Sequence, residues 1–334
     1  MNKMVKHDKE MKKKLIITNM RKEPKKFALA PIIVFAYNRA DKLEQLLTSL
    51  ERNAQIKNMD LYIFVDIPDK KNRKDRRYNQ QVITFLKKYQ SDCKMFKKIT
   101  IEISDKHRGL ADSIIHGVTK IVNKYGKVIV LEDDLKVSED FLDYMQRGLE
   151  IYKNDSRIWA VAGYCPVFKM PGKYKKDVFL VPRPESWGWG TWSERWNRCD
   201  WEVSTYQEFR KDILKRILFN IGGDDLGPML KRQMENAQYN SWAIRWGYQQ
   251  FLERKYTVYP KESRVIHCGT DNRSTHGAYF DTQVLKDNYK RCRFSYLRPD
   301  WNVIWHFRKA YRITLRQRVR SFANIVKNQI FTGK

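Results

Sequence analysis

Three consecutive carboxylates follow a short apolar run near the middle of the chain. Residues 128–131 read Val-Ile-Val-Leu, and Glu132, Asp133 and Asp134 come directly after them. Because unpaired carboxylates are costly to bury, we expect these side chains to leave the core where the apolar run ends. Clustered carboxylate oxygens suit a hard divalent cation such as Mn²⁺ or Mg²⁺, and such a cation suits a diphosphate. The alternative interpretation is a solvated loop after a strand.

The elements that would position these acids are short apolar segments that end in polar residues. Such segments cover residues 30–36, 61–65, 99–103 and 128–131, and stretches with helical spacing of apolar residues separate them. This alternation predicts an α/β fold with a mostly parallel, doubly wound sheet and helices on both faces. The carboxyl ends of parallel strands meet at one edge, where such sheets bind ligands. Besides the acids, the residues expected at that edge are Arg39, Asp66, His107 and Arg108.

The rest of the chain has a less regular pattern. The charged stretch 69–79 is predicted to be a loop, and residues 186–192 read SWGWGTW, which is too irregular for a helix. We predict helices over 226–236 and 241–254 and a strand over 256–260. No internal repeat or low-complexity segment is present.

The basic residues are concentrated at the two ends of the chain. The 334 residues carry a formal net charge of +28, with ten Lys and Arg in residues 1–30 and eight in residues 301–334. Such a charge favours anionic partners but does not determine the fold. We expect no nucleic-acid binding, because the excess lies at the termini and no nucleic-acid-binding motif is present. The five scattered cysteines and the absence of a long apolar run predict a cytoplasmic protein without a cleavable signal or spanning helix.

The C-terminal residues predict an amphipathic helix. Between residues 301 and 330 the apolar side chains recur at steps of three or four, and basic side chains occupy the other face. This pattern is typical of a helix that lies on an anionic membrane surface. It is also typical of a helix that docks on its own domain with a solvated basic face, and the pattern does not separate the two.

Taken in order, these motifs resemble those of inverting glycosyltransferases with the GT-A fold. The chain is similar to the large bacterial group of family 2 sugar transferases and, more distantly, to animal GlcNAc transferase I. The resemblance covers about residues 28–285. The matching residues are 34–39, 66, 108–110, 131–134, 186–189, 259–260 and 275–277.

This resemblance implies a nucleotide-sugar donor, Mn²⁺ or Mg²⁺ on its diphosphate, and an acceptor hydroxyl group. Asp134 would bind the metal directly, Asp133 would contact the ribose or the sugar, and Glu132 would support Asp133. Asp66 would hold the base of the nucleotide. The other residues expected at the donor or metal are Arg39, His107 and Arg108 near the base or phosphate, Trp187 and Trp189 at the sugar, and His276 beside the metal. For the two tryptophans and for His276 a structural role is the alternative.

Several residues are candidates for the catalytic base. Inversion requires a carboxylate that takes the proton of the attacking hydroxyl. Related sequences often have an acid directly after the residue that matches Trp242, but this chain has Ala243 there. Asp225 and Asp224 open a predicted helix and are the first two candidates, with Asp271 as a third. The alternatives are that these aspartates only cap the helix, or that the protein binds sugar nucleotides without catalysis.

We therefore expect a metal-dependent transferase that uses a UDP-sugar and a glycan or lipid-linked acceptor in surface polysaccharide synthesis. Its place would be the inner face of the cytoplasmic membrane. A nucleotidyltransferase is less favoured, because the first strand is not followed by a Gly-rich phosphate loop. The expected division is a basic leader over 1–27, a donor-binding half over 28–155, an acceptor-binding half over 156–285 and a basic amphipathic segment over 286–334.

Overall fold

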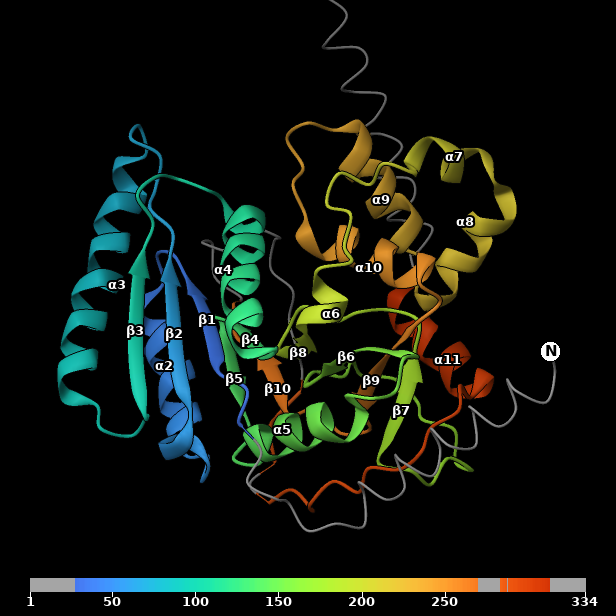
Figure 1. Ribbon diagram of the computed structural model, residues 1–334, viewed down its shortest axis with the longest axis horizontal. Coiled ribbons are helices and arrows are strands. Elements are labelled where there is room, and N and C mark those ends of the chain that lie inside the picture. The colour runs from blue at the N-terminus through green and yellow to red at the C-terminus, as the bar shows by residue number, and fades with distance from the viewer. Residues whose placement is uncertain (1–27, 270–282, 287, 313–334) are drawn as a thin grey trace, which may run out of the picture.

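The computed structural model describes residues 28–269, 283–286 and 288–312. In this part of the chain, a large mixed sheet forms the centre of the molecule (Figure 1). Its eight strands, in spatial order, are β3 (Lys98–Ile103), β2 (Asp60–Val65), β1 (Ile32–Ala36), β4 (Lys127–Glu132), β8 (Trp189–Trp192), β6 (Ile158–Ala162), β9 (Tyr256–Pro260) and β7 (Val178–Val181). All of these strands except β8 and β7 run in the same direction.

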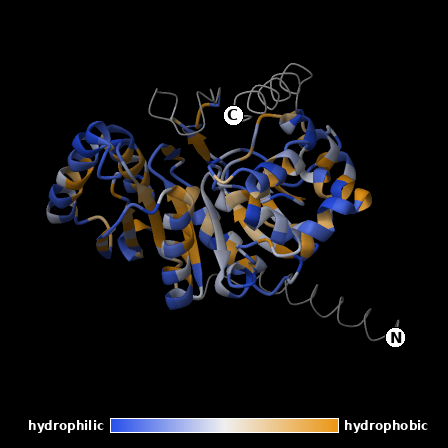
Figure 2. Cartoon of the chain, turned by 90° about the horizontal axis from the view of Figure 1, so that it is seen from above, coloured by the Kyte–Doolittle hydropathy of each residue, from blue (hydrophilic) through white to orange (hydrophobic). Residues whose placement is uncertain are grey.

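Helices cover both faces of this sheet. One face packs against α2 (Ala40–Glu51), α3 (Arg73–Asp92) and α5 (Phe141–Tyr152). The other face packs against α4 (Leu110–Tyr125), α6 (Ser193–Trp196) and α10 (Trp242–Leu252). Because successive strand residues point to opposite faces, Ile32 of β1 joins the first core and Ile33 joins the second. Figure 2 shows the hydrophobic strands between these helices. The predicted α/β class with helices on both faces is confirmed.

The remaining elements lie around the second half of the sheet. A third apolar cluster joins α7 (Tyr206–Lys211), α8 (Ile213–Phe219), α9 (Leu226–Glu235) and α10. The 3-10 turns are η1 (Ile56–Asn58), η2 (Asn220–Gly222) and η3 (Lys309–Tyr311). A separate pair of short antiparallel strands consists of β5 (Leu135–Val137) and β10 (Val265–His267). Helix α11 (Trp301–Arg308) packs near β7 and β9, and Phe307 is one of its buried residues.

Several predicted boundaries were wrong. Helix α3 begins at Arg73, inside the charged stretch predicted to be a loop, because the Asn72 side chain accepts a hydrogen bond from the Asp75 backbone and caps the helix. The strands β6, β7 and β8 were not predicted, since these four- and five-residue segments are buried throughout and show no alternation.

The C-terminal helix is short in the described residues. Helix α11 ends at Arg308 and the turn η3 follows it, while residues 313–330 of the predicted helix lie outside the described residues. The apolar side chains of Ile304 and Phe307 pack on the domain, so this part of the segment is docked. Among the described helices, none has both the length and the apolar character required to span a bilayer.

Candidate functional site

The ends of three neighbouring parallel strands build one polar rim. Strand register pairs Phe35 of β1 with Glu132 of β4, and Ala36 of β1 with Val65 of β2. The residues that follow these strands therefore emerge at the same edge of the sheet. This edge brings together the predicted residues Arg39, Asp66, His107, Arg108, Glu132, Asp133 and Asp134.

Arg39 is the residue that joins the two aspartates of this rim. Its Nη2 lies 2.7 Å from Oδ1 of Asp133, and its Nη1 lies 2.9 Å from Oδ2 of Asp134. The Tyr37 backbone N–H also donates to Asp133 at 3.2 Å. Only 3% of Asp133 and 7% of Asp134 is exposed. One guanidinium thus fixes both carboxylates in an almost buried position.

His267 completes this group, although the sequence analysis did not select it. Strands β5 and β10 pair so that His267 lies opposite Leu135. This register places Nε2 of His267 3.0 Å from Oδ2 of Asp134. The ring also stacks on Trp187 with 4.5 Å between centroids and 13° between planes. A signal was present in the sequence, because His267 ends an apolar segment just as the other rim residues do.

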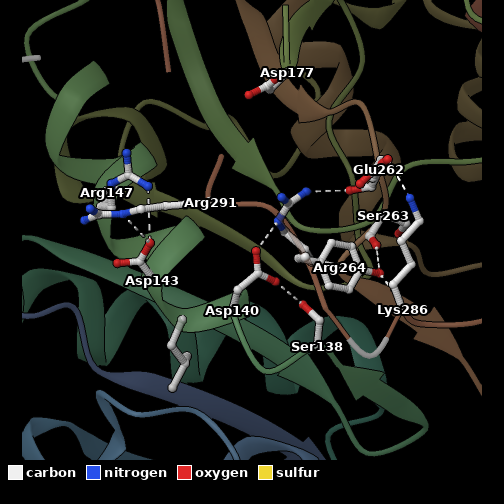
Figure 3. A network of polar contacts seen from close by, with 12 residues as sticks. Ser138, Asp140, Asp143, Arg147, Asp177, Glu262, Ser263, Arg264, Lys286 and Arg291 are labelled. Atoms are coloured by element: carbon white, nitrogen blue, oxygen red, sulfur yellow. Dashed lines mark hydrogen bonds and ion pairs between the residues drawn. The ribbon is translucent and has the colours of Figure 1, made fainter. Parts of the chain in front are cut away.

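A polar network at the start of β10 holds this strand in place (Figure 3). Arg264 precedes the strand, and its Nε donates to Asp140 at 3.1 Å. Asp140 also accepts a hydrogen bond from the Ser138 hydroxyl at 2.6 Å. Because Asp140 directly precedes α5, this network ties β10 to the first core and so fixes where His267 lies.

The three consecutive acids of the rim differ in how readily they ionise. Burial raises the pKa of Glu132 to about 8, and the neighbouring carboxylates add to the effect. Burial also raises the pKa of Asp133 to about 6 although Arg39 opposes it. For Asp134, the hydrogen bond from His267 and the charge of Arg39 outweigh burial, so its pKa is lowered. Of these three acids, Arg39 pairs with Asp133 and Asp134, and a bound cation would favour the ionised form of all three.

Asp66 organises the neighbouring loop. Its carboxylate accepts the backbone N–H groups of Arg108 at 3.0 Å and Gly109 at 2.9 Å, and Nδ1 of His107 lies at 3.1 Å. The Asn79 amide donates to the carbonyls of both Asp66 and Tyr37, which connects this loop to the acid cluster. Asp66 and Arg108 also line a cavity of about 340 Å³ at this end of the rim.

A second cavity lies beside Trp187. It has a volume of about 200 Å³, and its walls include Trp187, Trp242, Ala243 and Tyr311. Among the described residues that line it, Glu185 is the one carboxylate. The sequence analysis did not select Glu185, although it directly precedes residues 186–192, which we call the Gly/Trp motif.

Glu185 is buried but well hydrogen bonded. One carboxylate oxygen accepts the backbone N–H groups of Ser186 at 2.9 Å and Trp187 at 3.3 Å. The hydroxyls of Tyr259 and Tyr311 each lie 3.4 Å from the other oxygen. Burial raises the pKa of Glu185, and the nearby Arg183 and these hydrogen bonds only partly offset it. A carboxylate with a raised pKa at a cavity wall is a stronger base than an ordinary carboxylate.

The two aspartates predicted as bases lie in ion pairs. Asp225 forms a two-pronged pair with Arg183 at 2.7 and 2.9 Å, and Asp224 accepts from Arg308 at 2.7 Å. Asp225 is at the start of α9, but its side chain caps no backbone N–H there. Neither aspartate lines the cavity beside Trp187.

Of three other predicted residues, one lies in the core and two lie outside the described residues. The side chain of Trp189 is 1% exposed and stacks between Trp196 and Trp242, so it belongs to the core and has no surface for a ligand. His276 and Asp271 lie outside the described residues.

The carboxylate and imidazole atoms at the rim suit a divalent cation whose other ligands come from a bound substrate. Oδ2 of Asp134 and Nε2 of His267 are close together, and carboxylate and imidazole are both ligands that Mn²⁺ accepts. Within residues 28–269, 283–286 and 288–312, no three His, Cys, Asp or Glu side chains are grouped as a complete metal site. Cations of this type commonly take one or two protein ligands and complete their coordination with substrate phosphates.

Comparison with known proteins gives one family. The model of the GNT-I family matches residues 1–168. A curated relative, alpha-1,3-mannosyl-glycoprotein 2-beta-N-acetylglucosaminyltransferase of Arabidopsis thaliana, is 23% identical over 262 residues. This match covers 69% of the present chain and 56% of the relative, so the chain spans about half the length of that protein.

Similar solved structures include three transferases. GalNAc-T7 with UDP, GalNAc and Mn²⁺ has a TM-score of 0.45 at 12% identity, covering 73% of this chain and 44% of that one. Staphylococcus aureus TarS 1–349 with UDP has a TM-score of 0.39 at 10% identity, covering 71% and 59%. The mannosyltransferase PcManGT of Pyrobaculum calidifontis, with GDP-Man and Mn²⁺, has a TM-score of 0.33 at 12% identity, covering 56% and 54%. These likenesses are too weak to support a functional argument.

Proposed function

Since the chain belongs to the GNT-I family, we propose that it is a glycosyltransferase that moves a sugar from a nucleotide-sugar to a hydroxyl group. The observation that carries this proposal is the rim at the carboxyl edge of the sheet. There Asp133 and Asp134 are fixed by Arg39, and His267 bonds to Asp134. This is where open α/β sheets bind nucleotides.

Asp134 and His267 are the residues that would hold a divalent cation, Mn²⁺ or Mg²⁺, with the donor's diphosphate as the remaining ligand. When bound, the cation would balance the negative charge that develops on the leaving diphosphate. His276, which was predicted beside the metal, stays a further candidate outside the described residues. Arg39 keeps both carboxylates oriented, so its part is to position them and to limit their mutual repulsion.

The donor would lie along the rim. The cavity lined by Asp66 and Arg108 is the proposed place of the base and ribose, with His107 next to Asp66. The carboxylate of Asp66 stabilises the neighbouring loop through the backbone N–H groups of Arg108 and Gly109. Asp133, supported by Glu132, would contact the ribose or sugar. Trp187 is partly exposed between His267 and the second cavity, and we place the transferred sugar against it. Trp189 is left out of the proposed site because it is buried in the core.

For the base we add Glu185 to the predicted Asp225 and Asp224. In the proposed reaction the acceptor oxygen forms a bond to the anomeric carbon, the bond from that carbon to the diphosphate breaks, and the hydroxyl proton passes to the base. Glu185 faces the cavity beside Trp187, whereas Asp225 is neutralised by Arg183 and Asp224 by Arg308. The carboxylate oxygens of these two aspartates are thus engaged by guanidinium groups, and neither side chain lines the cavity in which we place the acceptor.

We also propose a donor, an acceptor and a location for this activity. A UDP-sugar donor, a glycan or lipid-linked acceptor in surface polysaccharide synthesis, and a position at the inner face of the membrane are supported by the motifs and by the basic termini. The name of the plant relative supports N-acetylglucosamine as the first sugar to test.

The test is a panel of UDP-, GDP- and CMP-sugars in thermal unfolding, each with Mn²⁺ and with EDTA. A ligand that binds only the folded state at 100 times its Kd stabilises it by about 2.7 kcal/mol, so Tm rises. We expect one nucleotide class to raise Tm only with Mn²⁺, and we expect Asp134→Asn to abolish the rise. Asp143→Asn is the matched control, because Asp143 pairs with Arg147 on α5 and lies outside the rim residues.

The absence of any shift in the panel would contradict the proposed function. A shift without sugar transfer or donor hydrolysis would instead favour a sugar-nucleotide-binding protein that lacks catalysis. One observation keeps this second candidate open, because Ala243 lies at the cavity wall where relatives often have an acid. Release of UDP from UDP-N-acetylglucosamine, followed over time, separates the two.

A further inference from the structure

Helix α8 exposes an apolar face that the domain does not use. Its residues Ile213, Leu214, Ile217 and Leu218 are 66%, 72%, 60% and 52% exposed. Soluble domains normally leave large aliphatic side chains exposed singly, so four on two turns of one helix form a patch that indicates a contact. Only Phe219, the last residue of α8, is buried, and it packs on Phe209, Tyr248 and Phe251.

The spacing places these side chains on one side of the helix. Residues at i and i+4 lie above one another, so Ile213 stacks with Ile217 and Leu214 with Leu218. Lys215 and Arg216 occupy the remaining arc and are exposed as well. Figure 2 shows hydrophobic residues at the outer right edge of the molecule, where α8 lies in Figure 1.

The charges around this face identify the kind of partner. Arg210 and Lys211 end α7 and are exposed, and Asp212 caps α8 after them with a carboxylate oxygen 3.7 Å from Nζ of Lys215. Four basic side chains and one acid thus lie within residues 210–216, and the net charge around the apolar face is positive. An apolar helix face with basic flanks is typical of segments that enter the headgroup region of an anionic bilayer. A second copy of the chain fits less well, because pairing through α8 would bring the basic residues of two molecules of net charge +28 together.

A second observation comes from the neighbouring helix. Both α8 and α11 contact the turn η2 (Asn220–Gly222), so the two helices lie near each other. On α11, Trp301 and Trp305 are one turn apart and are 62% and 54% exposed. Exposed tryptophans are frequent where a protein meets the membrane interface, because the ring is apolar and its N–H is polar.

We propose that α8 is a membrane-docking surface, which inserts Ile213, Leu214, Ile217 and Leu218 into the headgroup boundary of an anionic bilayer. This inference deepens the proposed function, because it names the surface that would bring the transferase to a lipid-linked acceptor. The sequence analysis considered membrane contact only for the C-terminal segment, and left open whether that segment binds a membrane or docks on its own domain. In the described residues of that segment, Ile304 and Phe307 are buried against the domain.

The test is flotation of the full chain with two kinds of vesicle, phosphatidylcholine alone and phosphatidylcholine mixed with phosphatidylglycerol. We expect binding to the anionic vesicles and a loss of about tenfold or more in Leu214→Ser/Ile217→Ser, since two large apolar contacts are removed. We expect Lys215→Gln/Arg216→Gln to weaken binding to anionic vesicles by about fivefold or more. Val284→Ser is the matched control, because Val284 is 85% exposed and lies outside α8 and α11.

The other possible occupants give different results. Equal flotation of the wild type and Leu214→Ser/Ile217→Ser, or no flotation at all, would overturn the proposal. So would a lower Tm of that variant without vesicles, because the face would then be covered by the chain itself. A wild-type dimer that the same variant converts to a monomer would assign the face to a second copy. None of these measurements uses a nucleotide-sugar, so this proposal and the proposed function fail independently.

Discussion

The proposed reaction uses two carboxylates with different surroundings, one for cation binding and one for proton transfer. Asp134 lies at the rim with Arg39 and His267, which keep it ionised. Glu185 lies at a cavity wall among tyrosine hydroxyls, where burial favours its protonated form. An ionised group suits a cation and a leaving diphosphate, whereas a group with a raised pKa suits proton transfer. Trp187 stands between them, since it stacks on His267 and also lines the cavity.

The base can be identified by comparing Glu185→Gln with Asp225→Asn. If Glu185 takes the proton, Glu185→Gln should lower kcat by about 10²–10⁴, and Asp225→Asn should lower it much less. Because the pKa of Glu185 is raised, the wild-type rate should fall on the acid side at a pH above the ordinary range of a carboxyl group. That acid limb should be missing in Glu185→Gln. The charged and titratable groups near Glu185 are Arg183, Tyr259, Tyr311 and the thiol of Cys165.

A nucleophile that carries no proton provides the control for this comparison. Azide attacks without a base, so Glu185→Gln should still release UDP from UDP-N-acetylglucosamine when azide is added, while release in water is lost. A variant that is merely misfolded would lose both reactions. The opposite ranking, in which Asp225→Asn loses the water reaction and Glu185→Gln keeps it, would assign the base to Asp225.

At the scale of elements, the pairing of β5 with β10 builds the candidate site. Asp134 directly precedes β5, and His267 is the last residue of β10, so the two proposed metal ligands meet because these strands are antiparallel neighbours. Gly188 lies against this pairing. It has a φ of +68°, and a Cβ added there would lie 2.7 Å from Cγ2 of Val265 in β10. This glycine therefore determines how closely the Gly/Trp motif approaches β10.

Replacing Gly188 should therefore affect both stability and ligand binding. Gly188→Ala should lower the free energy of unfolding by about 1–2 kcal/mol for the left-handed backbone, with about 1–3 kcal/mol more for the clash with Val265. It should also weaken donor binding, because His267 is displaced with β10. Gly126→Ala is the control, since Gly126 has a φ of +76° but no atom within 4 Å of the added Cβ. Denaturant unfolding and the donor-dependent Tm shift measure the two effects, and equal losses in both variants would contradict this role of Gly188.

At the scale of the whole molecule, helix α11 is part of the folded domain. Helix α11 packs on β7 and β9 through Phe307, whose ring contacts Phe179 at 6.0 Å and Tyr259 at 4.9 Å between centroids. Arg308 of α11 pairs with Asp224, and Tyr311 lies under Arg183 at 3.7 Å. These contacts connect the end of the described chain to the start of α9 and to the cavity that contains Glu185.

Two variants of α11 test how much this docking contributes to the stability of the whole domain. Phe307→Ala should lower the free energy of unfolding by about 3–5 kcal/mol, because the buried ring leaves a cavity. Trp305→Ala, on the exposed side of the same helix, should change it by less than about 0.5 kcal/mol. Chemical denaturation of both variants gives the comparison. A small effect of Phe307→Ala would mean that α11 is an appendage and not a part of the core.

The sequence by itself determined the class of fold and most of the rim. Buried strands of a parallel sheet are apolar throughout, so their ends stand out in the chain as changes to polar residues, as at Asp66 and Asp133. Parallel strands place these ends at one edge whatever their exact register. Local pattern was sufficient for this part. The predicted fold class and the resemblance to GlcNAc transferase I are confirmed, while the similarity to the bacterial family 2 group stays a prediction.

Only the tertiary structure decided which other side chains join the site. His267 reaches Asp134 across 133 residues through one strand pairing, and Glu185 faces a cavity that separate elements build together. The polar residue that ends the segment 265–267 is visible in the sequence, but neither contact is, because each contact depends on register and packing between distant segments. The same holds for α8. Apolar residues at steps of three or four show that one face of a helix is apolar, but only the packed structure shows whether that face is covered or exposed.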